Sequence, residues 1–397
     1  MKFEREFGQV NEYVIETRRT LHRLAEISDE EVQTFAFIKN EIENMGFDYE
    51  IVSTTSLVAR LATGRPGKVV AMRADIDALA VKENKKNLKY ERTCISNNPD
   101  TCHACGHDAH AAMLLASMKV LKQIKDQLVG TYYFCFEQGE ESGRKKGSVP
   151  IINYLSDKAV DTVWAIHVYN KLESGKICVD EGPRMAGIAG AIVKVIGKGG
   201  HGSRPDLSKN PVFVAANIVV NLAGVFENKI DANETVTLGI TTIEGGGTMN
   251  VFSDEAKILG TFRFFNEEEG NKAVTAFKSV CEHTAAMYGC SVEFDERTRV
   301  LGRPIKTDAK CSQFAKQVLP SFIDSSCLAS CVPWLASESF STYARTYPSI
   351  FAFLGIKNDE KGAGAEHHSE FFDIDEDALL VGVKATVGYA ISYAAKK

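Results

Sequence analysis

The sequence predicts an α/β protein of two domains, in which a smaller α+β domain is inserted into a larger one. The chain has 397 residues, more than a single hydrophobic core usually supports. Helix-period and strand-like segments alternate up to about residue 182 and again after residue 307. Between them the element order is β-α-β-β-α-β, which is typical of a compact module. We therefore expect one domain from residues 1–182 plus 297–397, and an inserted domain from residues 183–296.

The first 75 residues are predicted to form two helices and then three strands. Apolar spacing and stop signals give these ranges: Glu4–Glu26, Glu30–Met45, Phe47–Val52, Leu57–Thr63 and Val69–Met72. The last of these is an apolar run typical of a central strand buried on both faces. Arg73, Asp75 and Asp77 follow it, at the kind of strand end where α/β proteins place their sites; a charged turn is the alternative. His22 is expected to be a helix-face residue without a ligand role.

The stretch Thr101–Met113, TCHACGHDAHAAM, concentrates residues that bind metals. It contains two of the ten cysteines and three of the nine histidines. Apolar residues then recur near a 3.6-residue period, which predicts a helix over Ala109–Leu121 with Asp108 as its N-cap. Cys105 and His107 would lie in the loop entering this helix, where a thiolate and an imidazole suit a transition-metal ion. The alternative is a buried cysteine and a helix-start histidine without a chemical role.

Two more predicted strands lead to residues that could serve the same site. The strand Gly130–Phe136 runs into the adjacent carboxylates Glu140 and Glu141, and the strand Val160–Val168 carries His167 near its carboxyl end. In a tight loop flanked by glycines, both carboxylates can converge on one site. One could be a metal ligand while the other takes a proton from water. The alternatives are a solvated acidic turn and a histidine satisfied within the core.

The inserted module is predicted to follow a connector strand over residues 175–182. Its elements are two helices among four strands: Ile188–Gly197, Pro211–Phe226, Thr235–Ile243, Ala256–Phe265, Glu267–Gly289 and Ser291–Glu296. His201 falls in a glycine-rich loop and Asn250 follows a run of glycines, so each taken alone is a solvated loop residue. Arg263 lies inside an expected strand, where an arginine is costly unless it is paired. It is expected either in a salt bridge or as a clamp for a carboxylate.

Helix–strand alternation returns after residue 307. A helix is expected over Ala309–Val318, a strand over Ser349–Gly355 and a closing helix over Asp375–Ala395. Two adjacent histidines, His367 and His368, fall in the loop before the closing helix. Loop histidines are often only solvated, but one placed after a strand end could complete a metal site.

The composition argues against several functional classes. The net charge of −6 and the lack of a basic tract argue against a nucleic-acid partner. The N-terminal sequence MKFEREFGQVNEYV is charged and has no apolar signal region, and no uninterrupted apolar run suits a membrane span. The ten cysteines are then expected to be free thiols in a reducing compartment, so we expect a cytoplasmic protein. Neither a serine-nucleophile elbow nor a dinucleotide fingerprint is present.

A series of motifs, in a single order along nearly the whole chain, resembles the cysteine-containing branch of the dinuclear metal-dependent amidohydrolases and carboxypeptidases. The motifs are MRADIDAL, HACGHDAH, FEQGEESG, AIHV, GKGGHGSRP, GGGTMNVFSD, GTFR, SESF and HHSEFFDID. That branch includes aminoacylases, hippurate hydrolases, indole-acetyl-amino-acid hydrolases and aminobenzoyl-glutamate utilisation proteins. The resemblance implies a zinc-peptidase-like α/β/α catalytic domain with an inserted, ferredoxin-like lid or dimerisation domain.

The resemblance also implies a metal-ligand set, transferred position by position. The ligands would be Cys105, His107, Glu141, His167 and His368. His368 is preferred to His367 because it keeps the family's spacing to Phe371 and the DID run. Two divalent ions per chain are implied, which could be Mn, Zn, Co or Ni.

The same transfer implies the catalytic and substrate-binding residues. Glu140 would be the general base, and His201 would reach the scissile carbonyl, typically from the lid of a partner subunit. Asn250 and Arg263 would hold the substrate carboxylate. The implied reaction is hydrolysis of the amide bond of an N-acyl or N-aroyl amino acid by a homodimer that is paired through the inserted domain. A dipeptidase or aminopeptidase, or a metal-dependent binding protein without turnover, is the alternative.

The chain departs from the family pattern at a few positions. Where the family usually reads Q-P-A-E-E, this chain has Glu137, Gln138 and Gly139 before the two glutamates. Ser253 replaces a common proline, and Ser339 of SESF stands where the family usually has aspartate. The lid loop also lacks a second histidine. None of these departures removes a proposed ligand or the base, so they bear on the substrate more than on hydrolysis.

Overall fold

A computed structural model describes residues 2–144 and 146–396, and the chain divides into two compact units. We call the first the large unit; it comprises Met1–Gly182, Lys306–Val332 and Ser339–Lys397. The second, the small unit, comprises Pro183–Ile305 and Pro333–Glu338. Each unit has a hydrophobic core of its own.

A seven-stranded mixed sheet forms the centre of the large unit, in the order β1-β2-β4-β3-β5-β16-β6. The strands are β1 (Asp48–Ile51), β2 (Leu57–Ala62), β3 (Val69–Asp75), β4 (Thr131–Glu137), β5 (Thr162–Glu173), β6 (Ile177–Cys178) and β16 (Ser349–Lys357). β3 lies between β4 and β5 and is parallel to both, whereas β1, β2 and β6 run antiparallel to their neighbours. The carboxyl ends of β3, β4 and β5 therefore meet at one edge of the sheet.

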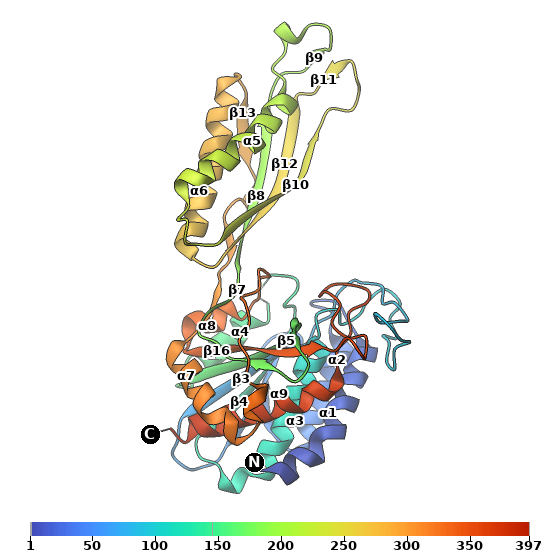
Figure 1. Cartoon of the computed structure of the whole chain (residues 1–397), viewed down its shortest axis with the longest axis vertical. Helices are drawn as coiled ribbons and strands as arrows, with labels where there is room; N and C mark the ends of the chain where they lie inside the picture. Colours follow the sequence, from blue (N-terminus) through green and yellow to red (C-terminus); the bar gives the residue numbers. More distant parts are fainter. Residues whose placement is uncertain (1, 145, 397) are drawn as a thin grey trace. The chain divides into compact units, whose positions relative to one another are not determined.

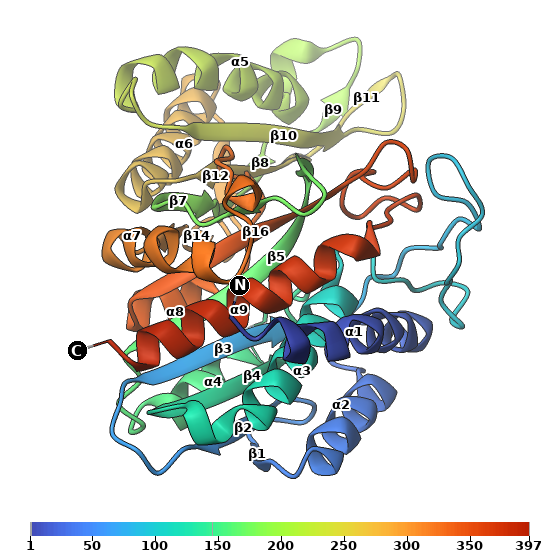
Figure 2. The ribbon, with the colours of Figure 1, turned by 60° about the horizontal axis from the view of Figure 1, so that its bottom comes forward.

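Helices cover both faces of this sheet (Figure 1). They are α1 (Glu4–Leu24), α2 (Val32–Asn44), α3 (His107–Gln123), α4 (Ser148–Leu155), α7 (Ala309–Val318), α8 (Ser341–Thr346) and α9 (Leu379–Ala394). α3 and α9 pack on β3 and β5, and α1 packs on α3 and α9 (Figure 2). α4 packs on β4, and α8 packs on α4 and β16. The large unit thus has the predicted α/β/α layers. α3 is apolar on most sides because helices and the sheet enclose it.

β3 extends three residues further than predicted. Arg73 and Asp75 therefore lie inside the strand, 5% and 0% exposed, and not in a charged turn. They pair in register with Cys135 and Glu137 of the parallel neighbour β4. Buried ionisable groups at the ends of two central strands are costly unless their charges compensate one another. The hydrogen bonds that provide this compensation lie beside the candidate site.

The small unit has the predicted β-α-β-β-α-β order. Its elements are β8 (Gly187–Ile196), α5 (Pro211–Lys229), β10 (Val236–Gly245), β12 (Glu255–Phe264), α6 (Glu267–Met287) and β13 (Ser291–Phe294). The sheet order β10-β12-β8-β13 is antiparallel throughout, and α5 and α6 pack on it, which is the ferredoxin-like arrangement. Asn210 and Asn266 cap the two helices by accepting hydrogen bonds from N–H groups of the first turn. A two-stranded ribbon joins β9 (Gly200–His201) to β11 (Val251–Phe252).

The small unit is longer than the expected insertion of residues 183–296. β14 (Val300–Gly302) pairs with β8, so residues 297–305 stay with this unit. Residues 333–338 belong to it as well, because Trp334 N–H donates to Arg184 O at 2.8 Å and Ala186 N–H donates to Ala336 O at 2.8 Å. The short strands β7 (Gly182–Met185) and β15 (Ile305–Thr307) span two of the boundaries along the chain. Such short pairings leave no periodic signal in the sequence.

Among the described residues, one helix is long and apolar enough to pass a length-and-composition test for a membrane span, and it is α5. Its side chains Val214, Ala215, Ile218 and Leu222 are buried in the core of the small unit. The apolar face of α5 that carries these residues therefore packs within a folded domain.

Candidate metal centre

Cys105 and His107 lie where the chain enters α3. The helix begins at His107, two residues earlier than predicted, so Asp108 belongs to its first turn and is not its N-cap. The residue before the helix, Gly106, has a left-handed φ of 85°, and a Cβ there would lie 2.4 Å from Val168 Cγ2. Only glycine meets both conditions without strain. This turn therefore holds Cys105 and His107 close against β5.

Five candidate ligands come together at this edge of the sheet. Cys105 Sγ lies 3.6 Å from His167 Nε2. Glu141 Oε1 lies 3.8 Å from His107 Nε2 and 3.2 Å from His368 Nε2. Donor atoms bound to one tetrahedral transition-metal ion at ~2.0–2.3 Å are roughly 3.3–3.8 Å apart. The observed spacings between donor atoms are close to this range.

His367, which the spacing argument set aside, also reaches this cluster. Its Nδ1 lies 3.8 Å from Cys105 Sγ, and its ring centroid is 5.5 Å from that of His167. Burial, and then the charge of the adjacent His368, lower the pKa of His367 well below its ordinary value. His368 is more exposed and has a φ of 65°. The structure thus brings both histidines to the centre, whereas the sequence argument selected only one.

Hydrogen bonds on the far nitrogen orient two of the histidine rings. His107 Nδ1 lies 2.9 Å from Asp77 Oδ1, and His167 Nδ1 lies 2.7 Å from Val168 O. Both oxygens act as acceptors, so each Nδ1 carries a proton and each Nε2 is the nitrogen that can bind a cation. Asp77 also accepts the Glu141 N–H at 2.9 Å. A carboxylate behind a histidine is the usual support for a metal ligand.

His110 and Asp75 lie beside the centre, but their polar atoms already make hydrogen bonds to other protein groups. His110 Nδ1 lies 2.6 Å from Asp75 Oδ1, and its Nε2 accepts the Val168 N–H at 2.9 Å. The other oxygen of Asp75 accepts from Arg73 at 2.7 Å. We therefore regard His110 and Asp75 as supporting residues. The sequence argument gave His110 no role.

The electrostatic field at the centre favours a cation. Burial opposes protonation of His107, but the carboxylates of Asp75 and Asp77 outweigh burial and raise its pKa to about 10. Burial and then the charge of Glu141 raise the pKa of the Cys105 thiol well above its ordinary value. The His107 shift expresses the negative charge of the nearby carboxylates, and the Cys105 shift expresses burial first and that charge second. A bound cation would neutralise this negative charge.

The donor set fits transition-metal ions. Two groups of donor atoms, each within 4.8 Å of one another, share the Cys105 thiol: one adds His107 and His167, and the other adds Glu141 and His368. His107 Nε2 and Glu141 Oε1 are buried and make no hydrogen bond to the described residues. Thiolate, imidazole and carboxylate together suit zinc-like ions better than magnesium or calcium. Two groups that share a thiolate provide donor atoms for two ions.

Glu140 lies next to these ligands and is held by the main chain. Its Oε1 accepts the Ser339 N–H at 2.7 Å. It also comes within 4.8 Å of the donor atoms of His107 and Glu141. The adjacent glutamates thus reach the same site from one loop, as the glycine-flanked sequence allowed.

A model of the peptidase family M20/M25/M40 matches residues 71–392. The match includes both donor groups and Glu140. The chain belongs to this family.

Relatives of the M20 family agree in length and fold. IAA-amino acid hydrolase ILR1-like 4 of Arabidopsis thaliana is 32% identical, over 96% of this chain and 86% of that protein. Thermostable carboxypeptidase 1 of Saccharolobus solfataricus is 31% identical, over 100% of this chain and 99% of that protein. The solved structure of Bacillus subtilis YXEP, described as a dinuclear metal binding peptidase from the M20 family, has a TM-score of 0.82 and 26% identity. It covers 98% of this chain, and this chain covers 99% of it.

The three remaining candidates lie in the small unit, toward opposite ends of its sheet. β9 pairs with β11, and Gly202 N–H donates to Asn250 O at 2.7 Å, so the exposed residues His201 and Asn250 are neighbours. Arg263 lies in β12 opposite Ile188 and eight residues beyond the start of that strand, which directly follows β11. At ~3.3 Å per residue, Arg263 lies roughly 26 Å along β12 from Glu255, the end of the strand that follows β11. A single small unit does not bring Arg263 and Asn250 to one carboxylate.

Arg263 is partly buried within its strand. Its guanidinium donates to Thr261 Oγ1 and, at 3.0 Å, to Phe262 O. Burial is the only influence on its pKa, which is lowered. No carboxylate pairs with Arg263 among residues 2–144 and 146–396, so the salt bridge considered from the sequence is not found there. Its charge remains available for an anionic ligand.

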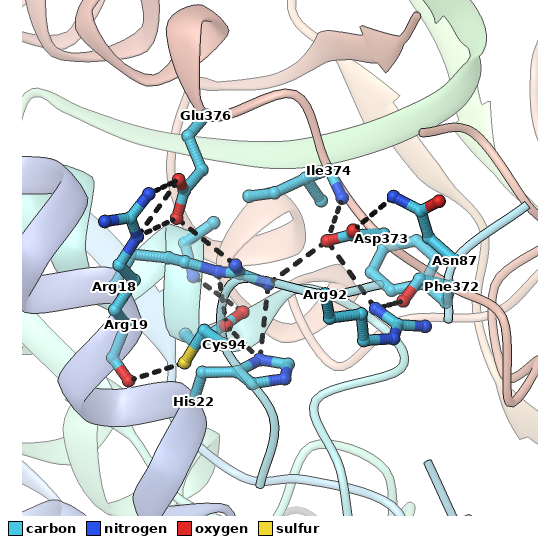
Figure 3. Close-up of polar contacts among 12 residues, drawn as sticks. Arg18, Arg19, His22, Asn87, Arg92, Cys94, Phe372, Asp373, Ile374 and Glu376 are labelled. Atoms are coloured by element: carbon cyan, nitrogen blue, oxygen red, sulfur yellow. Dashed lines mark hydrogen bonds and ion pairs between the residues drawn. The ribbon is translucent and has the colours of Figure 1, made fainter. Parts of the chain in front are cut away.

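A buried ion-pair network lies beside the first turn of α3, and Figure 3 shows the contacts around Arg18. Arg18 Nε donates to Asp108 Oδ2 at 2.8 Å, and His22 bridges Asp108 at 2.7 Å and Glu83 at 2.8 Å. Arg18 also reaches Glu376 at 3.3 Å. His22 lies on α1, as expected, and it is only 1% exposed because it packs into this network. The network ties the first turn of α3 to α1 and to the segment that follows the His367–His368 pair.

The charges in this network compensate one another. Burial and the charge of Arg18 oppose protonation of His22, but its hydrogen bonds to Asp108 and Glu83 outweigh them and raise its pKa. Burial favours the neutral form of Asp108, yet the Arg18 guanidinium keeps its pKa far below the usual range. Breaking such a pair exposes the full cost of the remaining buried charge.

Replacing Gly106 with alanine is expected to destabilise the fold by roughly 2–4 kcal/mol. About 1 kcal/mol comes from the left-handed φ, and the rest comes from the overlap of the new Cβ with Val168. The matched control is Gly143→Ala, because Gly143 has a φ of 63° but nothing within 4 Å of a built Cβ. It should lose only about 1 kcal/mol. Denaturant unfolding measures both, and equal losses would contradict this account of the turn.

Proposed function

We propose that the protein hydrolyses the amide bond of an N-acyl or N-aroyl amino acid and releases a carboxylic acid and a free amino acid. The observation that carries this proposal is the pair of donor groups sharing Cys105, with Glu140 beside them. The names of the relatives, an amino acid hydrolase and a carboxypeptidase, support the reaction class and the substrate class. The large unit would be the catalytic domain, and the small unit would be the lid.

Two divalent ions, of Mn, Zn, Co or Ni, would be held by the large unit. The residues that would hold them are Cys105, His107, Glu141, His167 and His368. When bound, such ions act as Lewis acids that polarise a carbonyl and make water a nucleophile at neutral pH. The hydrogen bonds of Asp77 and Val168 O to the far ring nitrogens would keep Nε2 of His107 and His167 in its ligating form.

Glu140 would be the general base. Its carboxylate would take a proton from the attacking water and pass it to the departing amine nitrogen. The Ser339 N–H holds one of its oxygens at 2.7 Å and so orients the carboxylate before substrate arrives. Proton transfer by a positioned group contributes ~10²–10⁴-fold to the rate.

The substrate-binding site would be completed by residues of the small unit. His201 would donate a hydrogen bond to the developing oxyanion, and Arg263 and Asn250 would bind the free carboxylate. Because Arg263 lies roughly 26 Å along β12 from the strand end that is nearer to Asn250 in the chain, a second copy of the chain would supply one of the two residues. We infer a homodimer paired through the small unit, in which His201 and Asn250 enter a site together.

The proposed setting is the cytoplasm, with small-molecule substrates and without a nucleic-acid or membrane partner. The structure pairs none of the ten cysteines in a disulfide, which suits a reducing compartment. The net charge of −6 and the lack of a basic tract disfavour nucleic acid.

Metal content tests the centre directly. Elemental analysis of protein purified without chelator should find about two transition-metal ions per chain, falling well below one in Cys105→Ala because both donor groups lose the shared thiolate. The matched control is Cys102→Ala. Cys102 lies in the same loop, but its side chain packs in the hydrophobic core, so this variant should keep its metal. Protein that holds no metal, and takes up none from added Mn or Zn, would contradict the proposal.

A substrate screen tests the reaction. N-acetyl, N-benzoyl and aminobenzoyl amino acids should be hydrolysed, whereas their carboxylate esters should be poor substrates because Arg263 and Asn250 lose the anion they bind. Preference for unblocked dipeptides with a free amine would instead indicate a dipeptidase or aminopeptidase. Metal-loaded protein that turns over none of these compounds would leave only a binding role.

A further inference from the structure

The carboxylate of Glu137 lies directly behind the loop that carries Glu140. Glu137 is the last residue of β4, three residues before Glu140, and it is 1% exposed. Its Oε2 accepts from Arg73 Nε at 2.7 Å and from the Tyr343 hydroxyl at 2.9 Å. Its Oε1 accepts from the Ser339 hydroxyl at 2.5 Å. Three donors thus converge on a single buried carboxylate.

Ser339 connects this carboxylate to Glu140. Its hydroxyl donates to Glu137 and accepts from Arg73 at 2.8 Å, which leaves the side chain a single arrangement. Its main-chain N–H donates to Glu140 Oε1 at 2.7 Å. The position of that N–H therefore depends on the contacts that Glu137 and Arg73 make with the hydroxyl of the same residue.

Arg73 balances the charge of this cluster. Asp75 and Glu137 face each other in register on the parallel strands β3 and β4, so two buried carboxylates lie side by side. Arg73 binds both, at 2.7 Å each. A third carboxylate beside Arg73 would be uncompensated, and the loss of Glu137 would remove one of the two carboxylates that Arg73 binds.

Glu137 and Ser339 are in direct contact, and the Ser339 hydroxyl also accepts from Arg73. Combining Glu137→Gln with Ser339→Asp would move one carboxylate across this hydrogen bond and leave the charge around Arg73 unchanged. Either change alone would alter that charge by one unit.

We propose that Glu137 is a positioning residue for Glu140, acting through Ser339, and that Glu137 and Ser339 work only as a matched pair. The proposal rests on the proposed function, in which Glu140 is the base. Glu137 does not touch substrate. It holds Ser339 so that the Ser339 N–H keeps the Glu140 carboxylate aimed at the centre. The alternative is that Glu137 and Arg73 form an ion pair that serves only to stabilise the ends of β3 and β4.

The test is a cycle of four proteins: wild type, Glu137→Gln, Ser339→Asp and the double variant. In Glu137→Gln the amide offers one acceptor where the carboxylate offered two, so at least one of three buried donors loses its partner. Ser339→Asp places a second carboxylate against Glu137. Because small displacements of a positioned group cost up to ~10²-fold, each single change should lower kcat by roughly 10–100-fold, with KM within about threefold and metal content unchanged.

The double variant decides between the two roles. It restores one carboxylate beside Arg73, so its kcat should return to within about fivefold of wild type instead of falling to the product of the two single losses. Tyr343→Phe is the matched control, because it removes another hydrogen bond to Glu137 without touching Ser339. It should lower the melting temperature while leaving kcat within about twofold.

The outcomes separate the inference from the proposed function. If wild type hydrolyses N-acyl amino acids but Glu137→Gln changes only the melting temperature, Glu137 is a stabilising residue and the inference fails. A double variant whose loss of kcat equals the product of the two single losses would also overturn it. A metal-loaded wild type without hydrolytic activity overturns the proposed function itself, and the positioning role with it. Should Ser339→Asp not fold, Ser339→Ala replaces it, with an expected loss of kcat at unchanged KM.

Discussion

Glu140→Gln is expected to lower kcat by about 10²–10⁴-fold, the largest loss of activity among the changes considered. Glutamine keeps the size of the side chain and can still accept the Ser339 N–H through its carbonyl oxygen. It cannot accept a proton near neutral pH, so general base catalysis is lost while the shape of the site is kept. Steady-state kinetics on the best N-acyl amino acid, with KM and metal content measured on the same preparation, would show this result.

The adjacent glutamate provides the matched control. Glu141 has its Oε1 within 3.2 Å of His368 Nε2 and belongs to one of the two donor groups. Glu141→Gln should therefore lower metal content, and its activity should recover in part when metal is added in excess. The Glu140 variant should show neither effect. Retained kcat in Glu140→Gln, or loss of metal from it, would exclude Glu140 as the base.

Arg18→Met is expected to cost the largest amount of stability, about 3–5 kcal/mol. Arg18 is 3% exposed and binds Asp108 at 2.8 Å, so its removal leaves a carboxylate charge in the interior, for which His22 is the remaining ion-pair partner among the described residues. Methionine keeps an unbranched side chain, so the effect of lost packing is small. Because Asp108 follows His107 in the first turn of α3, metal affinity should weaken as well. Denaturant unfolding of the metal-free protein isolates the stability effect.

The neighbouring arginine tests whether burial is the cause. Arg19 also binds Glu376, at 2.6 Å, but its side chain is 28% exposed. Arg19→Met should cost no more than about 1 kcal/mol, as is usual for an ion pair that water can reach. Similar losses in both variants would mean that the buried network behind α3 contributes no more than a surface ion pair.

The architecture could be predicted because most helices and strands follow hydrophobic patterns within their own segments. Apolar runs and helical spacing place α7 at the predicted bounds and most other elements within a few residues, because these signals lie within one segment. α4 and α8 were not predicted. α8 has six residues with little apolar periodicity, and it forms by packing on α4 and β16. Short helices of this kind depend on tertiary contacts more than on propensity.

The candidate centre was predicted from motif order, but its supporting residues were not. Cys105, His107, Glu141, His167 and His368 were named from the sequence, and the structure brings their donor atoms together. His110 was missed because its role depends on Asp75, in a different strand, and on a backbone N–H of β5. His367 was set aside by spacing alone. Spacing distinguishes neighbours along the chain, but it does not show which side chain turns inward.

The sequence by itself determined which donor atoms this protein carries, their order, and the two kinds of domain that hold them. Only the tertiary structure decided which charges meet. Arg18 with Asp108, and Arg73 with Glu137 and Ser339, join residues 64–266 positions apart or in separate elements, and all of them are buried. From the sequence alone, a charged residue is assumed to be solvated, because water solvates it in the unfolded chain. Folding removes that water, and an unpaired buried charge is then energetically costly. The partner of such a charge can therefore be identified only in the folded structure.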